Sequence, residues 1–253
     1  MSRVYIATFS NNAVEAAKKY GVNIELNDIC ISESLNPESF DATVERMKQE
    51  VAGSGAADVI MHGPFTEIIP AGIDRRFVKL GMDRLNEAYE ACQAMGVDRM
   101  VVHTGYEPLM YFKEWHHERS VEFWREYMKD KGNFHIYIEN VFDDEPLMMK
   151  DLIDELDDPR IRVCLDVGHA NAVTKPEYDV YSWIEILGDR IGHFHLHNND
   201  GTDDQHRQLL DGYLDMERIL DCAEKYCSHD VTFTIESHEC RDSVEWLKER
   251  VDR

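Results

Sequence analysis

Eight short β-rich segments alternate with eight longer segments of helical period along this chain. The β-rich segments cover residues 4–9, 23–30, 58–65, 99–105, 135–141, 161–170, 191–200 and 231–238. The helical segments cover residues 12–21, 38–55, 75–96, 112–132, 146–158, 178–189, 215–227 and 242–252. Eight βα units in one chain predict an α/β protein of the (β/α)8 barrel type. An open, doubly wound sheet of eight strands is the alternative.

Glycines support this division into βα units. Gly21, Gly96 and Gly132 each end a helical segment and precede a β-rich one, as helix-terminating glycines do. The length of 253 residues suits one barrel, and no linker, low-complexity tract or GxGxxG turn supports a split. We therefore expect a single domain over residues 1–253.

The acidic composition limits the possible partners. The chain has 50 acidic and 27 basic residues, and a net charge of −23 disfavours nucleic acid and anionic membranes. The chain has no run of eighteen apolar residues, so we expect no membrane span. Six cysteines without CxxC spacing, and no signal-like opening stretch, predict a reduced cytoplasmic protein. We expect a small-molecule substrate, and the sequence does not predict an oligomeric state.

Ionisable side chains gather where the predicted strands end. In a (β/α)8 barrel the carboxyl ends of the strands and the loops after them form the active site. A lone histidine or glutamate there is usually a hydrogen-bonded rim residue, but burying many together is costly without a charge partner. A bound cation supplies that partner. Nine candidate ligands follow six consecutive strands: His62, His103, Glu139, Asp166, His169, His195, Asp204, His206 and Glu236.

The stretch HFHLHNNDGTDDQH at residues 193–206 contributes three of these ligands. His193, His195 and His197 alternate with two apolar residues, so in a strand they share one face. Histidine and carboxylate ligands without thiolate suit Zn²⁺, Mn²⁺ or Fe²⁺, and a histidine-rich set favours zinc. Bridging carboxylates allow one to three ions.

At these residues the sequence resembles the xylose-isomerase-like TIM barrel superfamily, which includes sugar-phosphate isomerases and epimerases as well as endonuclease IV. The resemblance spans nearly the whole chain. In the epimerases, four ligands after strands five to eight hold one metal ion, and His169, in the DxxH spacing of LDVGH, resembles their substrate-contacting histidine. The four matching ligands are Glu139, Asp166, His195 and Glu236.

Endonuclease IV holds three zinc ions, and its ligand pattern falls on all nine candidate residues. The spacing of Asp204 and His206 in DQH distinguishes this set from that of single-metal epimerases. Two departures disfavour duplex DNA as the substrate. The loop continues as RQLLDG where endonuclease IV has a turn resembling LGEG, and no basic surplus is available for phosphate contacts.

Two chemistries follow from the resemblance. The first is a metal-dependent isomerase or epimerase of a sugar or sugar phosphate, in which Glu139 and Glu236 move the proton as base and acid and His169 holds a substrate oxygen. The second is an endonuclease IV-like zinc phosphoesterase acting on a small phosphoester, with Glu139 as the bridging carboxylate. A barrel without catalytic activity, serving as a binding module, is the third interpretation.

The sequence indicates less specific roles for the remaining polar and aromatic residues. Glu25 and Asn140 lie near strand ends. Each side chain could contact a substrate, cap a helix or support a metal ligand, and the sequence does not decide among these roles. We assign His135 and His193 to packing near the barrel floor, and we leave His197 and His238 near the mouth unassigned. In the helical segment 112–132, we expect surface histidines and helix-packing aromatic residues: His116, His117, Trp115, Phe123 and Trp124.

Overall fold

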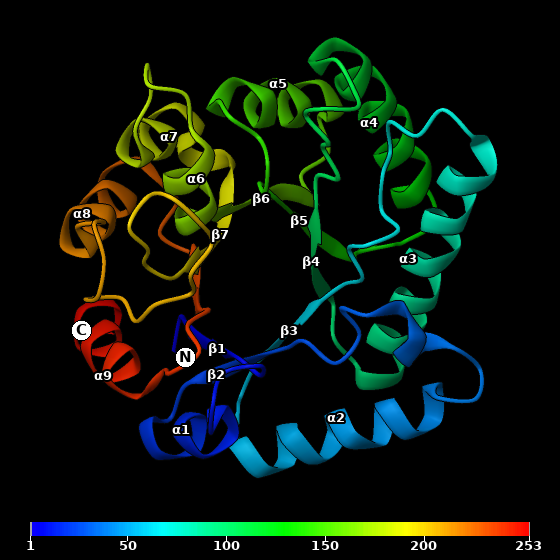
Figure 1. Ribbon diagram of the computed structural model, residues 1–253. Coiled ribbons are helices and arrows are strands. Elements are labelled where there is room, and N and C mark those ends of the chain that lie inside the picture. The colour runs from blue at the N-terminus through cyan, green and yellow to red at the C-terminus, as the bar shows by residue number, and fades with distance from the viewer. Residues whose placement is uncertain (1, 253) are drawn as a thin grey trace.

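A closed barrel of eight parallel strands forms the centre of the computed structural model, which describes residues 2–252 (Figure 1). The strands pair in chain order, and β8 pairs back to β1 with Thr234 opposite Tyr5. The predicted TIM barrel is therefore confirmed, and the open-sheet alternative is wrong. The strands are β1 (Val4–Ala7), β2 (Asn23–Leu26), β3 (Val59–His62), β4 (Arg99–His103), β5 (His135–Glu139), β6 (Ile161–Asp166), β7 (Ile191–Leu196) and β8 (Thr232–Ile235).

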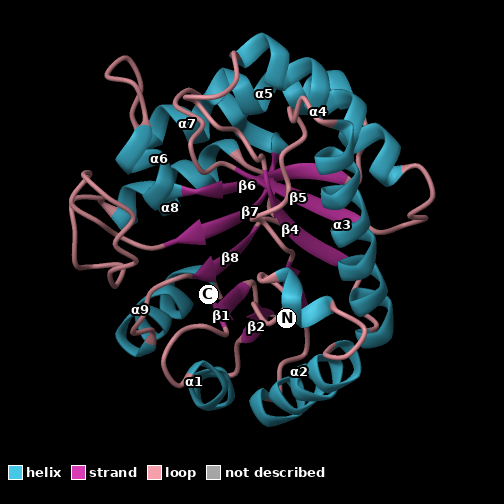
Figure 2. Cartoon of the chain, turned by 45° about the vertical axis from the view of Figure 1, so that its right-hand side comes forward, coloured by secondary structure: helices cyan, strands magenta, loops and turns pink. Residues whose placement is uncertain are grey.

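The helices surround the barrel (Figure 2). Helices α1 to α8 lie between successive strands, and α9 follows β8. Two helices instead of one lie between β6 and β7. The helices are α1 (Ala13–Tyr20), α2 (Phe40–Ser54), α3 (Arg75–Met95), α4 (Lys113–Met128), α5 (Pro146–Leu156), α6 (Val167–Val173), α7 (Val180–Leu187), α8 (Met216–Tyr226) and α9 (Arg241–Val251), with 3₁₀ turns η1 (Ser32–Leu35) and η2 (Gly188–Arg190).

Each of the eight predicted β-rich segments extends beyond its strand, and one of them runs into a helix. The segment 161–170 divides at Asp166, where β6 ends and α6 begins. The Asp166 carboxylate accepts the backbone N–H of His169 at 2.6 Å, which is the hydrogen bond of a helix N-cap. His169 therefore belongs to the first turn of α6, and its side chain lies beside that of Asp166.

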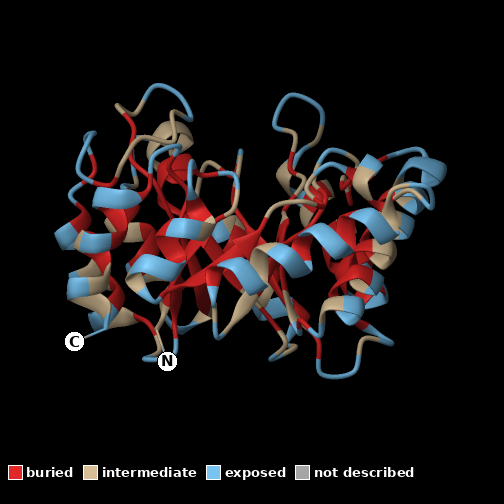
Figure 3. Ribbon diagram, turned by 90° about the horizontal axis from the view of Figure 1, so that it is seen from below, coloured by how far each residue is buried: buried red, intermediate tan, exposed pale blue. Residues whose placement is uncertain are grey.

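The main core lies between the strands and the helices. Figure 3 shows the buried residues in the interior and the exposed ones on the outer helices and loops. On β7, Phe194 and Leu196 belong to the main core, whereas His193 and His195 point into the barrel, as the alternation predicts. A second, smaller cluster fills the amino-terminal end of the barrel interior. Its members are Tyr5, Ile60, Val101, Tyr137 and Cys164.

The two adjacent histidines on α4 differ in burial. His116 is buried, with its ring 5.0 Å from that of Tyr106 and its Nε2 3.3 Å from the Ser120 hydroxyl. The prediction that it is a solvated residue is wrong, because Ser120 and Tyr127 follow it on the packed face of the helix. His117 lies nearer the surface and pairs with Glu155 at 2.7 Å. Among the described residues, no helix is long and apolar enough to cross a membrane.

Candidate metal centre

All nine predicted ligands lie at the carboxyl-terminal mouth of the barrel, in three adjoining clusters. Within each cluster, one nitrogen or oxygen atom of every member lies within 4.8 Å of the others. The inner cluster comprises Glu139, Asp166, His195 and Glu236; the second, His62, His103 and Glu139; and the outer one, His169, His197, Asp204 and His206.

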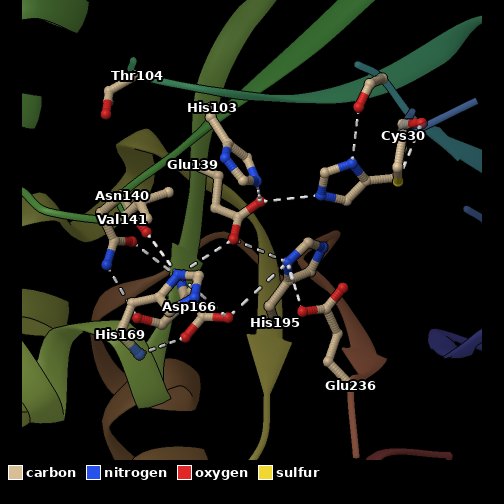
Figure 4. Close-up of polar contacts among 12 residues, drawn as sticks. Cys30, His103, Thr104, Glu139, Asn140, Val141, Asp166, His169, His195 and Glu236 are labelled. Atoms are coloured by element: carbon tan, nitrogen blue, oxygen red, sulfur yellow. Dashed lines mark hydrogen bonds and ion pairs between the residues drawn. The ribbon is translucent and has the colours of Figure 1, made fainter. Parts of the chain in front are cut away.

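Glu139 joins the clusters, because each of its oxygens faces two imidazoles (Figure 4). Its Oε2 lies 3.3 Å from Nε2 of His62 and 3.4 Å from Nε2 of His103. Its Oε1 lies 3.3 Å from Nδ1 of His169 and 3.4 Å from Nδ1 of His195. Glu139 ends β5 at the centre of the mouth, so its carboxylate is placed as a bridging ligand would be.

Unpartnered atoms in the inner cluster fit a divalent cation. Oδ2 of Asp166 and Nδ1 of His195 are buried, and neither has a hydrogen-bond partner among the described residues. They lie 4.0 Å apart, and Nδ1 is also 3.3 Å from Oε2 of Glu236. Buried polar atoms are rarely left without a partner, and carboxylates gathered around one buried imidazole need a positive charge among them. A cation among these atoms removes both costs.

The outer cluster gathers three imidazoles around Asp204. Its carboxylate lies 3.3 Å from Nε2 of His169, 3.1 Å from Nε2 of His206 and 3.5 Å from Nε2 of His197. His206 adopts a left-handed backbone conformation with φ of 43°, which is costly for a residue other than glycine. The loop after β7 thus holds strain at the residue that completes the cluster.

The electrostatics of the two glutamates differ. Burial raises the pKa of Glu236, and the nearby charge of Glu139 adds to this effect. Burial acts the same way on Glu139, but His195 and His103 hold the pKa of Glu139 well below its ordinary value. Burial lowers the pKa of His103 to about 3, so this imidazole is neutral and able to bind a metal ion.

Two residues near strand ends support the ligands instead of lining the mouth. Glu25 has no exposed surface, and its Oε1 lies 3.1 Å from Nε2 of His195. The Asn140 amide donates to the backbone oxygen of Asp166 at 3.0 Å and accepts from its N–H at 2.9 Å. Both are fully buried and outside the cavity lining, so the geometry favours the supporting role over a substrate contact.

A cavity of about 720 Å³ opens above the clusters. No lysine or arginine is among the described residues that line it. Part of its wall is apolar, with Ile68, Ile69 and the aromatic rings Phe9, Phe65, Tyr106 and Phe142.

Two lining residues at the rim had no assigned role from sequence. His238 faces the cavity and lies 5.8 Å from His206 between ring centroids. Cys30 also lines the cavity, and its Sγ lies 3.8 Å from the backbone oxygen of His62. The position of Cys30 just after β2 was the only sequence signal for it, because a lone cysteine has no motif.

Comparison with known proteins identifies the family of this chain. A family model described as xylose isomerase-like TIM barrel matches residues 10–250. An uncharacterized protein of Methanocaldococcus jannaschii, MJ1311, is 26% identical over 221 residues, covering 77% of this chain and 70% of that protein.

Solved structures share the fold over the whole chain. A D-tagatose 3-epimerase-like protein is 22% identical with a TM-score of 0.77, covering 100% of this chain and 97% of its own. The TTHB071 protein of Thermus thermophilus, soaked with ZnCl2, is 20% identical with a TM-score of 0.76, covering 98% of this chain and 97% of its own. Other structures of this fold include sugar epimerases.

Proposed function

Because this chain belongs to the xylose isomerase-like TIM barrel family, we propose that it is a metal-dependent sugar isomerase or epimerase. In the proposed reaction a proton moves at a carbon next to a carbonyl of a small polyhydroxylated substrate. Glu139, Asp166, His195 and Glu236 would hold the metal ion, for which zinc is the favoured candidate and manganese or iron are alternatives, and the ion would supply the positive charge that polarises that carbonyl. The similarity to sugar epimerases and to a structure soaked with zinc chloride supports this proposal.

The observation that carries the proposal is the placement of two glutamates around one imidazole. Glu139 ends β5 and Glu236 follows β8, and their carboxylates lie 3.4 and 3.3 Å from Nδ1 of His195. They reach this point from different sides of the ring of strands, so a substrate above them has one carboxyl group on either side. One glutamate takes the proton and the other returns it.

His169 completes the proposed set of catalytic residues. It lies on α6 with Nε2 3.3 Å from Asp204, and it lines the cavity. From this position its imidazole reaches both the outer cluster and a substrate oxygen. The proposed ligands of the metal ions are the nine residues named from sequence, with one to three ions according to occupancy.

An uncharged sugar fits the cavity better than a phosphorylated one. Cations that reach the loops at the mouth are paired with acids: Arg46 of α2 with Asp28 at 2.5 Å, and Arg207 of the loop after β7 with Asp200 at 3.0 Å. Lys113 likewise pairs with Asp144 and Glu145. No described lysine or arginine is therefore left in the cavity to bind a phosphate, and the apolar wall suits the face of a sugar ring.

The test is solvent deuterium exchange. Purified protein loaded with Zn²⁺, Mn²⁺ or Fe²⁺ is incubated with a panel of free and phosphorylated ketoses in D₂O, and hydrolysis of a generic phosphodiester is measured in parallel. We expect deuterium incorporation next to the carbonyl of a free ketose, and no hydrolysis. Glu236→Gln and Glu139→Gln should each abolish exchange. Hydrolysis without exchange would replace the proposal by the second candidate.

That second candidate is a zinc-dependent phosphoesterase on a small substrate. The outer cluster favours it, because His169, Asp204 and His206 would hold an ion beyond the inner one. Adjacent zinc ions activate a water and clamp the two oxygens of a displacement. Such ions could bind a phosphate that the side chains do not, so the hydrolysis assay is run with excess zinc.

A further inference from the structure

We propose that Glu25, inside the barrel, is a positioning residue that fixes which nitrogen of His195 binds the metal ion. Glu25 belongs to β2 and is fully buried. It does not line the cavity, so it cannot touch a substrate there. The inference rests on the proposed metal site but not on the reaction that takes place there.

Geometry around His195 assigns the role of each ring nitrogen. Nε2 lies 3.1 Å from Oε1 and 3.3 Å from Oε2 of Glu25, so it carries the proton and donates to the carboxylate. Nδ1 points the opposite way, to the inner cluster, and has no hydrogen-bond partner among the described residues. A carboxylate that accepts from the far nitrogen of a ligand histidine holds its ring and tautomer and increases its basicity.

Two other donors hold the Glu25 carboxylate in place. The Thr234 hydroxyl donates to Oε2 at 2.6 Å, and Nε2 of His193 lies 3.1 Å from the same oxygen. His193 is itself fixed by the Thr232 hydroxyl, 2.6 Å from its Nδ1, and by the ring of Tyr137, stacked 5.5 Å away. The carboxylate therefore has one orientation, and that orientation is passed on to His195.

A purely structural role would have a different signature. A buried carboxylate is costly, and it is retained where its hydrogen bonds or a nearby cation offset the cost. If Glu25 only filled the barrel, its replacement would change the stability of the metal-free protein and leave the intrinsic metal affinity of the folded state unchanged. If Glu25 positions His195, the metal affinity of the folded protein changes.

The experiment compares Zn²⁺ affinity of the full chain before and after Glu25→Gln. The amide keeps the size of the side chain but removes its charge. By competition with a chromophoric chelator, we expect Zn²⁺ to bind about 10- to 100-fold more weakly, as for other partners of ligand histidines. Asp143→Asn is the matched control, because Asp143 is also a buried carboxyl group near the mouth but lies outside the clusters. Its affinity should equal that of the unchanged protein.

A second variant and a spectroscopic measurement keep the inference testable if Glu25→Gln does not fold. Thr234→Val removes the hydroxyl that orients Glu25 and should weaken Zn²⁺ binding in the same direction by a smaller factor. In the zinc-loaded, ¹⁵N-labelled protein, His195 should show a protonated Nε2 and a metal-bound Nδ1, and Glu25→Gln should disturb this pattern.

Three outcomes separate the inference from the proposed function. Equal Zn²⁺ affinity of the folded Glu25→Gln variant and the unchanged protein would overturn the inference and leave the proposed function standing. A metal-bound Nε2 on His195 would also overturn it. An unchanged protein that binds no divalent ion would overturn the proposed function itself.

Discussion

His197 holds the carboxylate of Asp166, with its Nε2 3.1 Å from Oδ1. The same oxygen accepts the N–H of His169 at 2.6 Å, so two donors occupy it. The other oxygen, Oδ2, has no hydrogen-bond partner among the described residues and faces the inner cluster. His197 therefore directs the free oxygen of Asp166 to the place of the proposed ion, although His197 lies within the outer cluster.

Replacing His197 should weaken metal binding at the inner cluster. In His197→Asn the shorter amide cannot reach Asp166 as the imidazole does, and Asp166 gains freedom to rotate. We expect Zn²⁺ affinity to fall about 10-fold, as is typical when a hydrogen bond to a ligand is lost. Isothermal titration measures it. His117→Asn, on the outer side of α4, is the control, and an equal affinity of both variants would contradict the assigned role.

Gly168 leaves the space that the His197 ring occupies. A Cβ atom at residue 168 would lie 2.0 Å from Cε1 of His197, much closer than atoms can pack. Gly168→Ala should therefore cost about 1–3 kcal/mol of unfolding free energy, the usual cost of overpacking. Denaturant unfolding measures this cost. In the double variant with His197→Ala the added loss should disappear, and simple additivity of the two changes would show that they do not interact.

The fold could be predicted from the sequence because the same strand-and-helix pattern repeats eight times. Eight alternations of strand and helix period leave few architectures, and each strand end marks the same rim. Seven of the nine candidate ligands could be named for this reason, since they lie at or within three residues of a strand end and so at the same rim. Asp204 and His206 lie farther along the loop after β7 and were named from the polar stretch at residues 193–206. Their assembly into clusters follows from topology.

Supporting residues were harder to predict, because their partners come from other strands. Glu25 meets His195 only when β2 and β7 face each other across the barrel interior, a relation that no local pattern encodes. His197 continues the alternation of His193 and His195, so its inward direction was predictable. Its contact with Asp166 was not, because that contact depends on the start of α6 at residue 167. His116 looked solvated because charged residues surround it in sequence, whereas the helix face decides its burial.

The outer cluster should account for a separate metal ion. Asp204→Ala combined with His206→Ala removes two of its four members and leaves all four residues of the inner cluster. We expect elemental analysis to show about one divalent ion fewer per chain than in the unchanged protein. Replacement of Asp200 and Gln205 by alanine in the same loop is the control. An identical metal content in the Asp204/His206 variant and the unchanged protein would exclude a separate outer ion.

Asp143 should make the folded protein less stable as the pH rises. A carboxylate paired with a cation has the opposite effect. Burial raises its pKa from 3.8 to about 6, although the Thr104 hydroxyl donates to it at 2.7 Å. Between these values the folded chain binds a proton that the unfolded chain has lost, so stability falls as pH rises through this range. Above it the ionised group costs roughly 3 kcal/mol. Asp143→Asn removes this cost, so the unfolding free energy of the variant minus that of the unchanged protein should increase from pH 4 to pH 8. Asp151→Asn, exposed on α5, is the control variant. A difference for Asp143→Asn that does not change with pH would show that the pKa of Asp143 is the same in the folded and unfolded chain.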